Sequence, residues 1–276
     1  MQKTIKKQSR VGLLTAAVFA AGLAVVLLLW LLAAPKSVRI EQPGLDASYD
    51  LPINIRSADA FSKTVDGYIS YPGARLGIDV SSHQQEIDWQ RVKAAGVEFA
   101  ILRAGFRGYG EGSLIEDERF RDNLIGAKEA GLDVGVYFFS QAVSEQEAVE
   151  EAEFVLSLLG GETISLPIFF DWEEIGENGS RTAGNVSGLV GDCALAFCRR
   201  IEEAGYTAGV YFNQRYGYTI MQLEQLRSFT FWLAEYRDAP SFLYDFQVWQ
   251  YTGEGKVDGI ETVVDLDLLF SQGGSA

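Results

Sequence analysis

Residues 128–139 read Lys-Glu-Ala-Gly-Leu-Asp-Val-Gly-Val-Tyr-Phe-Phe, which joins the end of a helix to an apolar strand. Gly131 stands where a left-handed residue commonly ends a helix, because glycine adopts a positive φ without steric cost. The same Ala-Gly arrangement occurs twice more, before the apolar stretches Phe99–Arg103 and Ala208–Phe212. Three copies of a helix stop followed by a strand start predict that helices and strands alternate.

Eight strand candidates follow residue 73 when this pattern is extended along the chain. They are Leu76–Val80, Phe99–Arg103, Val134–Phe139, Pro167–Phe170, Ala208–Phe212, Phe231–Ala234, Phe246–Trp249 and Val263–Leu266. Helices separate the first five or six, including one that Ser144 and Glu147 open as a capping box, whereas the last connections are short and rich in glycine. The pattern predicts an α/β fold, an incomplete (β/α) TIM-like barrel with an irregular C-terminal third. A doubly wound open sheet is the alternative.

The N-terminal region predicts a single transmembrane helix. Val11–Ala34 is a 24-residue apolar stretch without a charge, long enough to span a bilayer. Four basic residues and no acidic residue precede it, which favours a cytoplasmic N-terminus. A cleaved signal peptide is the competing interpretation, because Leu32-Ala-Ala34 resembles a cleavage site. The length of the apolar stretch and the position of Pro35 after such a cut favour an uncleaved signal-anchor.

These features divide the chain into three parts. Residues 1–35 are predicted to form the cytoplasmic N-terminus and the signal-anchor, residues 36–73 an extracytoplasmic stalk, and residues 74–276 the barrel. The stalk prediction rests on several prolines and on the lack of a sustained apolar period. We expect a single-pass protein of the cell membrane with its barrel outside, or a secreted form if the segment is cleaved.

Composition argues against several kinds of function. Four of the 23 basic residues precede the predicted span, which leaves 19 basic against 38 acidic side chains in the remainder. Such a surface repels nucleic acid, so no nucleic-acid partner is expected.

Cys193 and Cys198 are five positions apart in a helical stretch and point to different sides, which argues against a disulfide. Two cysteines and the single His83 offer no metal site, and no cofactor is expected.

Leu166–Glu173 is an apolar strand that ends in two carboxylates. Asp171 and Glu173 are two positions apart, so they project to the same side of the strand. Carboxylates at the end of a buried strand are costly for stability, and a pair of them is what acid/base cleavage of a glycosidic bond requires. Taken alone, the pair would be interpreted as a solvated strand end with a helix-capping Asp.

Other strands place polar and aromatic residues at the same expected rim. In parallel barrels the chemistry lies at the carboxyl ends of the strands. The candidates there are the carboxylates Asp79 and Asp265 and the aromatic residues Tyr137, Tyr211, Tyr236 and Trp249. Crowded carboxylates raise one another's pKa, which keeps one protonated as an acid near neutral pH. Asp79 alone has about even odds of being a helix cap, and Trp249 alone is more often a packing residue, so the prediction rests on their convergence.

Seven phrases of the sequence resemble glycoside hydrolase family 25, the Chalaropsis-type lysozymes or N-acetylmuramidases. They are Gly77-Ile-Asp-Val-Ser-Ser-His-Gln84, Ile87-Asp-Trp89, Gly135-Val-Tyr-Phe-Phe-Ser140, Phe170-Asp-Trp-Glu173, Trp232-Leu-Ala-Glu-Tyr236, Trp249-Gln-Tyr-Thr252 and Val264-Asp-Leu266. The resemblance covers roughly residues 76–270. It implies an incomplete α/β barrel and cleavage of the β-1,4 bond between N-acetylmuramic acid and N-acetylglucosamine in peptidoglycan glycan strands. It also implies that Glu173 is the general acid, Asp171 its partner, and Asp79 and Asp265 further active-site carboxylates.

Two departures from the family pattern accompany the resemblance. Asp267 stands where the family usually has Asn, and residues 103–108 read Arg-Ala-Gly-Phe-Arg-Gly in place of the commoner Thr-Glu-Gly type. The rival interpretation is a membrane-anchored peptidoglycan-binding module that has lost its chemistry. A chitinase-like hydrolase is a weaker rival, because Pro167, Ile168 and Phe169 occupy the stretch where its further Asp would stand.

Overall fold

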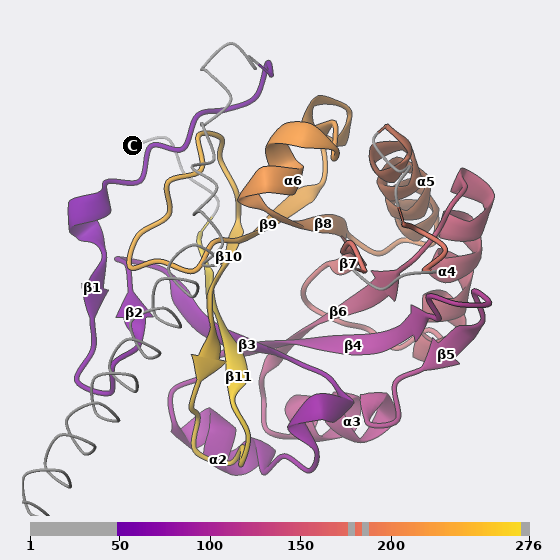
Figure 1. Ribbon diagram of the computed structural model, residues 1–276. Helices are drawn as coiled ribbons and strands as arrows, with labels where there is room; N and C mark the ends of the chain where they lie inside the picture. Colours follow the sequence, from indigo (N-terminus) through magenta and orange to yellow (C-terminus); the bar gives the residue numbers. More distant parts are fainter. Residues whose placement is uncertain (1–48, 176–179, 184–187, 272–276) are drawn as a thin grey trace, which may run out of the picture. The chain divides into compact units, whose positions relative to one another are not determined.

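The computed structural model describes residues 49–175, 180–183 and 188–271. The described residues belong to the unit Ser48–Ala276. Figure 1 shows this unit as a sheet wrapped into a barrel, with helices along part of its outside. The predicted transmembrane segment lies outside the described residues. Among the residues that are described, no helix has the length and apolarity needed to cross a bilayer.

Eight strands close into the barrel, and hydrogen-bonded neighbours follow the order β3-β11-β10-β9-β8-β7-β6-β4, with β4 pairing back to β3. Their bounds are β3 Arg75–Val80, β4 Phe99–Arg107, β6 Asp133–Ser140, β7 Ile168–Trp172, β8 Ala208–Asn213, β9 Thr230–Ala234, β10 Val248–Gly255 and β11 Val264–Leu269. Short β5 (Leu114–Glu116) extends the sheet beside β4. The β3–β4 pairing excludes the open doubly wound sheet, because an open sheet would leave both edges unpaired.

All eight predicted strands are present, but one runs against the others. The six pairings from β3 through β4, β6, β7, β8 and β9 to β10 are parallel. Strand β11 pairs antiparallel with both β10 and β3. The TIM-barrel designation therefore requires correction, since that fold has eight parallel strands, each followed by a helix. The structure is a closed eight-stranded barrel with helices between its first strands, and its last third is irregular as predicted.

Five α-helices lie between the barrel strands of the described residues, and their ends agree with the predicted glycine stops and with the predicted cap at Ser144. They are α2 Trp89–Ala94, α3 Phe120–Glu129, α4 Glu145–Leu159, α5 Leu189–Glu203 and α6 Gln214–Thr219. Ser144 caps α4 by accepting a hydrogen bond from the Glu147 backbone N–H at 3.2 Å. The glycines of the three Ala-Gly phrases have φ values of 93° at Gly96, 74° at Gly131 and 88° at Gly205. These left-handed positions confirm the helix stops that the sequence predicts.

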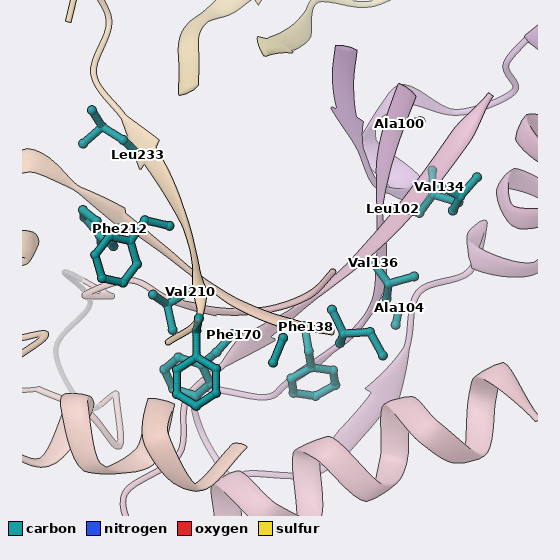
Figure 2. Packing of buried hydrophobic residues seen from close by; sticks show 14 of the residues in the cluster. Ala100, Leu102, Ala104, Val134, Val136, Phe138, Phe170, Val210, Phe212 and Leu233 are labelled. Carbon is teal, nitrogen blue, oxygen red and sulfur yellow. The ribbon is translucent and has the colours of Figure 1, made fainter. Parts of the chain in front are cut away.

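Alternation along the strands creates two hydrophobic clusters. Side chains on one face meet inside the barrel, where Phe99, Ile101, Phe169, Trp232 and Val248 pack together. Side chains on the opposite face form a larger outer core that packs against the helices. Figure 2 shows part of it, with Phe138, Phe170 and Val210 directed toward neighbouring helices. Each barrel strand is thus buried on both faces, which explains the near-continuous apolar runs in the sequence.

Residues 49–73, part of the predicted stalk, pack on the barrel instead of standing apart from it. Arg56 Nη1 lies 2.6 Å from Asp245 Oδ1, and its Nη2 donates to the Phe246 carbonyl oxygen at 2.7 Å. Phe61 meets the ring of Trp249 edge-on at 5.3 Å between centroids. A small hairpin, β1 (Ser62–Lys63) and β2 (Ile69–Ser70), follows. The domain packed on the barrel therefore begins before residue 74.

Cys193 and Cys198 are both unbonded and buried on α5. The Cys198 thiol donates to the Gly209 carbonyl oxygen at 3.4 Å. Burial is the main cause of a raised pKa in both thiols, to about 12 at Cys193. The predicted absence of a disulfide between them is confirmed, and the thiols belong to the packing between helix and barrel.

The packing of Arg56 yields a stability prediction. We expect Arg56→Ala to lower the free energy of unfolding by about 1–3 kcal/mol, because it removes two charge-assisted hydrogen bonds and the cation contacts with Phe246 and Phe270. The control is Arg91→Ala, which removes an ion pair whose partners are 60% and 61% exposed and should cost much less, because exposed ion pairs are screened by solvent. Urea denaturation of both variants measures the difference. Equal losses would show that the contacts of Arg56 contribute no more to stability than an exposed ion pair.

Candidate active site

Asp171 and Glu173 lie at the carboxyl end of β7, in the middle of the parallel part of the barrel. Strands β6 and β8 flank β7, and Asp171 pairs in register with Phe139 and Tyr211. Asp171 is 5% exposed and its Oδ1 has no hydrogen-bond donor among the described residues. Glu173 follows the last strand residue and exposes part of its surface at the rim. One carboxylate is thus buried and the other opens to solvent.

A cavity of about 200 Å³ opens at this rim. Its lining residues are Asp79, Arg103, Tyr137, Phe139, Asp171, Glu173, Tyr211, Trp232, Tyr236, Gln250 and Asp265. The structure therefore brings together seven of the eight predicted site residues, from β3, β6, β7, β8 and β11 and from the segments that follow β7 and β9.

Trp249 is the exception, and its predicted contact with substrate is corrected. Its side chain is fully buried in the outer core, where Nε1 donates to the Glu235 carbonyl oxygen at 2.8 Å. Successive residues of a strand point to opposite faces, so Gln250 points into the barrel while Trp249 points out. The neighbouring Gln250 is the residue of β10 that reaches the cavity.

Gln250 links the two sides of the cavity through hydrogen bonds. Its Nε2 donates to Asp79 Oδ2 at 2.7 Å, and its Oε1 accepts from the hydroxyls of Tyr211 and Tyr236, each at 3.0 Å. Asp79 therefore does not cap the following turn, a role that Ser81 takes. This network fixes the amide orientation of Gln250 and holds two tyrosine rings at the cavity wall.

Asp267 lies next to Asp79, below the cavity, and is completely buried. Its Oδ1 accepts from Trp232 Nε1 at 2.8 Å, while its Oδ2 has no donor among the described residues. The carboxyl groups of Asp267 and Asp79 lie close enough for each to shift the pKa of the other. Two ionised carboxylates offer only acceptors to each other, so a proton held between them would satisfy both.

Burial and mutual repulsion raise the pKa values of this acidic cluster. Burial and the charges of Asp265 and Asp267 raise the pKa of Asp79 well above its ordinary range. Burial raises the pKa of Asp265 to about 6 and that of Asp267 to about 7. The cluster therefore retains protons at mildly acidic pH, where isolated aspartates would be ionised.

Asp171 and Glu173 form a second coupled pair. Burial, followed by the charge of Asp265, raises the pKa of Glu173, as the sequence predicts in direction. Burial and the charge of Glu173 also raise the pKa of Asp171. The Arg103 guanidinium opposes this rise at Asp171. The rise is larger at Asp171 than at Glu173, and the Arg103 charge acts against it, so the two adjacent carboxyls share the available proton.

Arg103 comes from one of the two segments that depart from the family pattern. Its Nη2 lies 2.7 Å from Oδ2 of the buried Asp117, and the same group donates to Ser82 Oγ at 3.2 Å. These contacts direct the guanidinium into the wall of the cavity. The departure therefore supplies a fixed positive charge beside Asp171.

Some residues of the site were not identified from the sequence. Gln141 is fully buried and donates from Nε2 to the Glu173 carbonyl oxygen at 2.9 Å, while its Oε1 accepts from Thr182 at 2.7 Å. It thereby holds the backbone on which Glu173 stands. Phe139 and Trp232 also line the cavity. Inward alternation along β9 would have identified Trp232, whereas the contacts of Gln141 depend on a loop path that no local pattern predicts.

A closed barrel with a rim pocket of coupled carboxylates and tyrosines is the architecture of a glycoside hydrolase. The sequence profile described as Glycosyl hydrolases family 25 matches residues 78–260. The chain belongs to this family.

Two curated relatives are similar over the same region. The "Autolytic lysozyme" of Clostridium acetobutylicum is 28% identical over 199 residues, which cover 71% of this chain and 56% of that protein. "Lysozyme M1" of Streptomyces globisporus is 28% identical over 203 residues, which cover 68% of this chain and 65% of that protein. The chain thus spans between half and two thirds of the length of these relatives.

Solved structures share the fold. The modular autolysin LytC from Streptococcus pneumoniae superposes with a TM-score of 0.65 at 22% identity, covering 80% of this chain and 52% of that one. A family 25 glycosyl hydrolase from Bacillus anthracis gives a TM-score of 0.58 at 23% identity, covering 72% of this chain and 89% of that one.

The buried Asp267 predicts a pH-dependent effect on stability. Because its pKa is raised to about 7 in the folded chain, the folded state holds a proton that the unfolded state loses near pH 4. Stability therefore falls as pH rises between these values, by up to about 1.4 kcal/mol per pH unit. Asp267→Asn keeps an acceptor for Trp232 and removes this titration.

The measurement is urea denaturation of the wild type and of Asp267→Asn at several pH values. We expect the advantage of the variant to grow from pH 4 to pH 7 and to level off above pH 7. Asp122→Asn, at a side chain that is 73% exposed, is the control and should show no such growth. A constant difference between wild type and Asp267→Asn across this range would contradict the raised pKa.

Proposed function

We propose that the protein is a peptidoglycan hydrolase that cleaves the β-1,4 bond between N-acetylmuramic acid and N-acetylglucosamine. The observation that carries this proposal is the convergence of Asp79, Asp171, Glu173 and Asp265 in one tyrosine-lined cavity. Membership of family 25 and the autolytic lysozyme and lysozyme relatives support the same substrate. The reaction is glycosidic hydrolysis by acid/base chemistry, in which the leaving oxygen takes a proton and a water molecule supplies the hydroxyl group that the anomeric carbon gains.

Glu173 is the proposed general acid. It stands at the exposed rim, where a leaving-group oxygen can reach it, and its raised pKa keeps the proton available. Gln141 fixes the carbonyl group of the same residue, which limits the positions that the carboxyl can take. The acid thus combines access to substrate with a restrained backbone.

Asp171 is the proposed partner of Glu173, with two possible roles. It either steadies the substrate's N-acetyl group as an internal nucleophile or activates a water molecule. Its buried Oδ1 accepts no hydrogen bond from the described residues, so it is free to accept the N–H of an N-acetyl group. This orphaned acceptor favours N-acetyl participation, which retains the anomeric configuration, whereas direct attack by water inverts it.

The remaining residues of the cavity are proposed to bind the sugar. Tyr137, Tyr211 and Tyr236 present ring surfaces and hydroxyls, and Asp79 and Asp265 present acceptors for sugar hydroxyl groups. Gln250 holds Asp79 and two of these tyrosines together. Polar contacts of this kind become stronger in a water-poor cavity.

Two other functions make different predictions for the same site. A peptidoglycan-binding module without chemistry would bind the glycan and show no turnover, and the presence of all four matched carboxylates argues against it. A chitinase-like hydrolase would cleave N-acetylglucosamine polymers that lack N-acetylmuramic acid. Turnover on purified peptidoglycan, followed by mass analysis of the fragments, separates the three functions.

Substitution of the proposed acid gives the direct test. Glu173→Gln keeps the size of the side chain and removes the acidic proton, so we expect turnover on peptidoglycan to fall by about 10²–10⁴-fold. Asp171→Asn should give a comparable or smaller loss. Glu174→Gln, at the neighbouring exposed position, is the matched control and should retain wild-type turnover. Wild-type turnover in a folded Glu173→Gln variant would exclude the assignment.

We also propose that Val11–Ala34 anchors the protein and that the barrel lies outside the cell. The four-to-zero basic bias before the span supports this orientation, and a wall-cleaving activity requires access to the wall. Protease added to intact protoplasts should release a folded fragment whose N-terminus lies before Tyr49, because residues from 49 onward pack on the barrel. Protection of the whole barrel would refute the orientation. A native chain that begins near Pro35 would refute the anchor.

A further inference from the structure

A second cavity lies beside the proposed active site, between the β1–β2 hairpin and the last strands of the barrel. We refer to it as the hairpin groove; its volume is about 470 Å³. Its lining comes from the hairpin, from the segment after β9, from the end of β10 and from β11. The lining residues are Lys63, Asp66, Gly67, Tyr68, Ile69, Tyr236, Arg237, Asp238, Tyr251, Thr252, Glu254, Gly255, Lys256 and Leu266. The hairpin is held in place by Tyr68, whose hydroxyl donates to the Lys256 carbonyl oxygen at 3.0 Å.

The hairpin groove and the catalytic cavity share a wall. Tyr236 lines both of them and is 60% exposed. Gly253 lies at the same boundary, where a Cβ atom would come within 3.1 Å of Asp265 Oδ1 and 3.4 Å of the Tyr236 hydroxyl. Because Gly253 has no side chain, nothing from β10 projects between the two spaces at this point.

The sizes of the two cavities differ in a way that matters for a polymeric substrate. Pockets that enclose drug-sized ligands measure roughly 300–1,000 Å³, and the catalytic cavity, at about 200 Å³, is smaller. Cleavage inside a glycan strand requires sugar residues on both sides of the broken bond. The catalytic cavity alone is too small for them, whereas the adjoining hairpin groove has the required volume.

The hairpin groove offers a saccharide aromatic surface and charged side chains of both signs. Tyr68, Tyr236 and Tyr251 supply aromatic surface, and the charged lining residues are balanced, with Lys63, Arg237 and Lys256 against Asp66, Asp238 and Glu254. Lys63 Nζ lies 2.8 Å from Asp238 Oδ1, so an ion pair connects the hairpin to the segment after β9. In a chain of net charge −15, this groove offers donors and acceptors in equal measure, as sugar hydroxyl and N-acetyl groups require.

We propose that the hairpin groove extends the substrate cleft and binds further sugar residues of the glycan strand that is cut at Glu173. The inference rests on the proposed function and adds a determinant of chain-length preference. The hairpin precedes residue 78, where the family match begins, so this part of the cleft is contributed by residues outside the matched region.

The test compares short and long peptide-free glycan strands as substrates of the full chain in detergent. The variant is Lys63→Ala/Lys256→Ala, which removes two exposed amines from the lining of the groove, one in the hairpin and one just after β10. We expect the ratio of kcat/KM on long strands to kcat/KM on a tetrasaccharide to fall roughly tenfold, because each amine contributes hydrogen bonds of modest strength. Lys93→Ala/Lys128→Ala removes the same charge from exposed positions on α2 and α3 and should retain the wild-type ratio.

The outcomes separate this inference from the function on which it rests. An unchanged ratio in the groove variant, or the same change in the control, would overturn the inference while leaving the hydrolase assignment in place. If the wild type cleaves no strand, the proposed function fails. In that case the affinities of the wild type and the groove variant for long strands are measured directly. Equal affinities would overturn the proposed role of the hairpin groove.

Discussion

Closure of the barrel by an antiparallel strand is the constraint on which the site depends. Strand β11 fits between β10 and β3 and runs opposite to both. Its beginning, and not its end, therefore lies at the rim where the parallel strands end. This reversal places Asp265 opposite Asp79 in register, and it brings the two carboxylates together without a helix between their strands. A parallel final strand would present the apolar residues of its other end to the same rim.

The raised pKa values of the buried acids are a consequence of the apolar interior of the barrel. Phe99, Phe169 and Trp232 fill the space inside the barrel and exclude water from it. A carboxylate at the edge of such a space loses solvation, so the proton is held more tightly. The same loss lowers stability at neutral pH, because the folded chain must either retain the proton or bury a charge. The arrangement therefore lowers stability at neutral pH in return for carboxyl groups that stay protonated at mildly acidic pH.

Much of the fold and most of the site follow from local patterns in the sequence. Glycine helix stops and apolar runs predict all eight strands, because both signals come from residues close together in the chain. Two predictions needed information that is not local. Asp265 was placed at the end of a parallel strand but stands near the start of a reversed one. Trp249 was placed with substrate although strict alternation assigns it to the face opposite Gln250. The direction of a strand, and the face to which each of its side chains points, depend on how the whole sheet closes. The loop that Gln141 contacts is determined by tertiary contacts alone.

The irregular last third of the barrel also explains why residues 49–73 pack where they do. Helices cover the outer faces of the earlier strands, but the connections near β10 and β11 are too short to supply one. The outward rings of Trp249 and Phe270 would then be exposed, at a cost that grows with apolar area. Phe61 and Tyr71 cover them through edge-on ring contacts, and Arg56 adds cation contacts over Phe246 and Phe270. This packing fixes the position of the β1–β2 hairpin beside the rim, so the segment that completes the core also forms a wall of the hairpin groove.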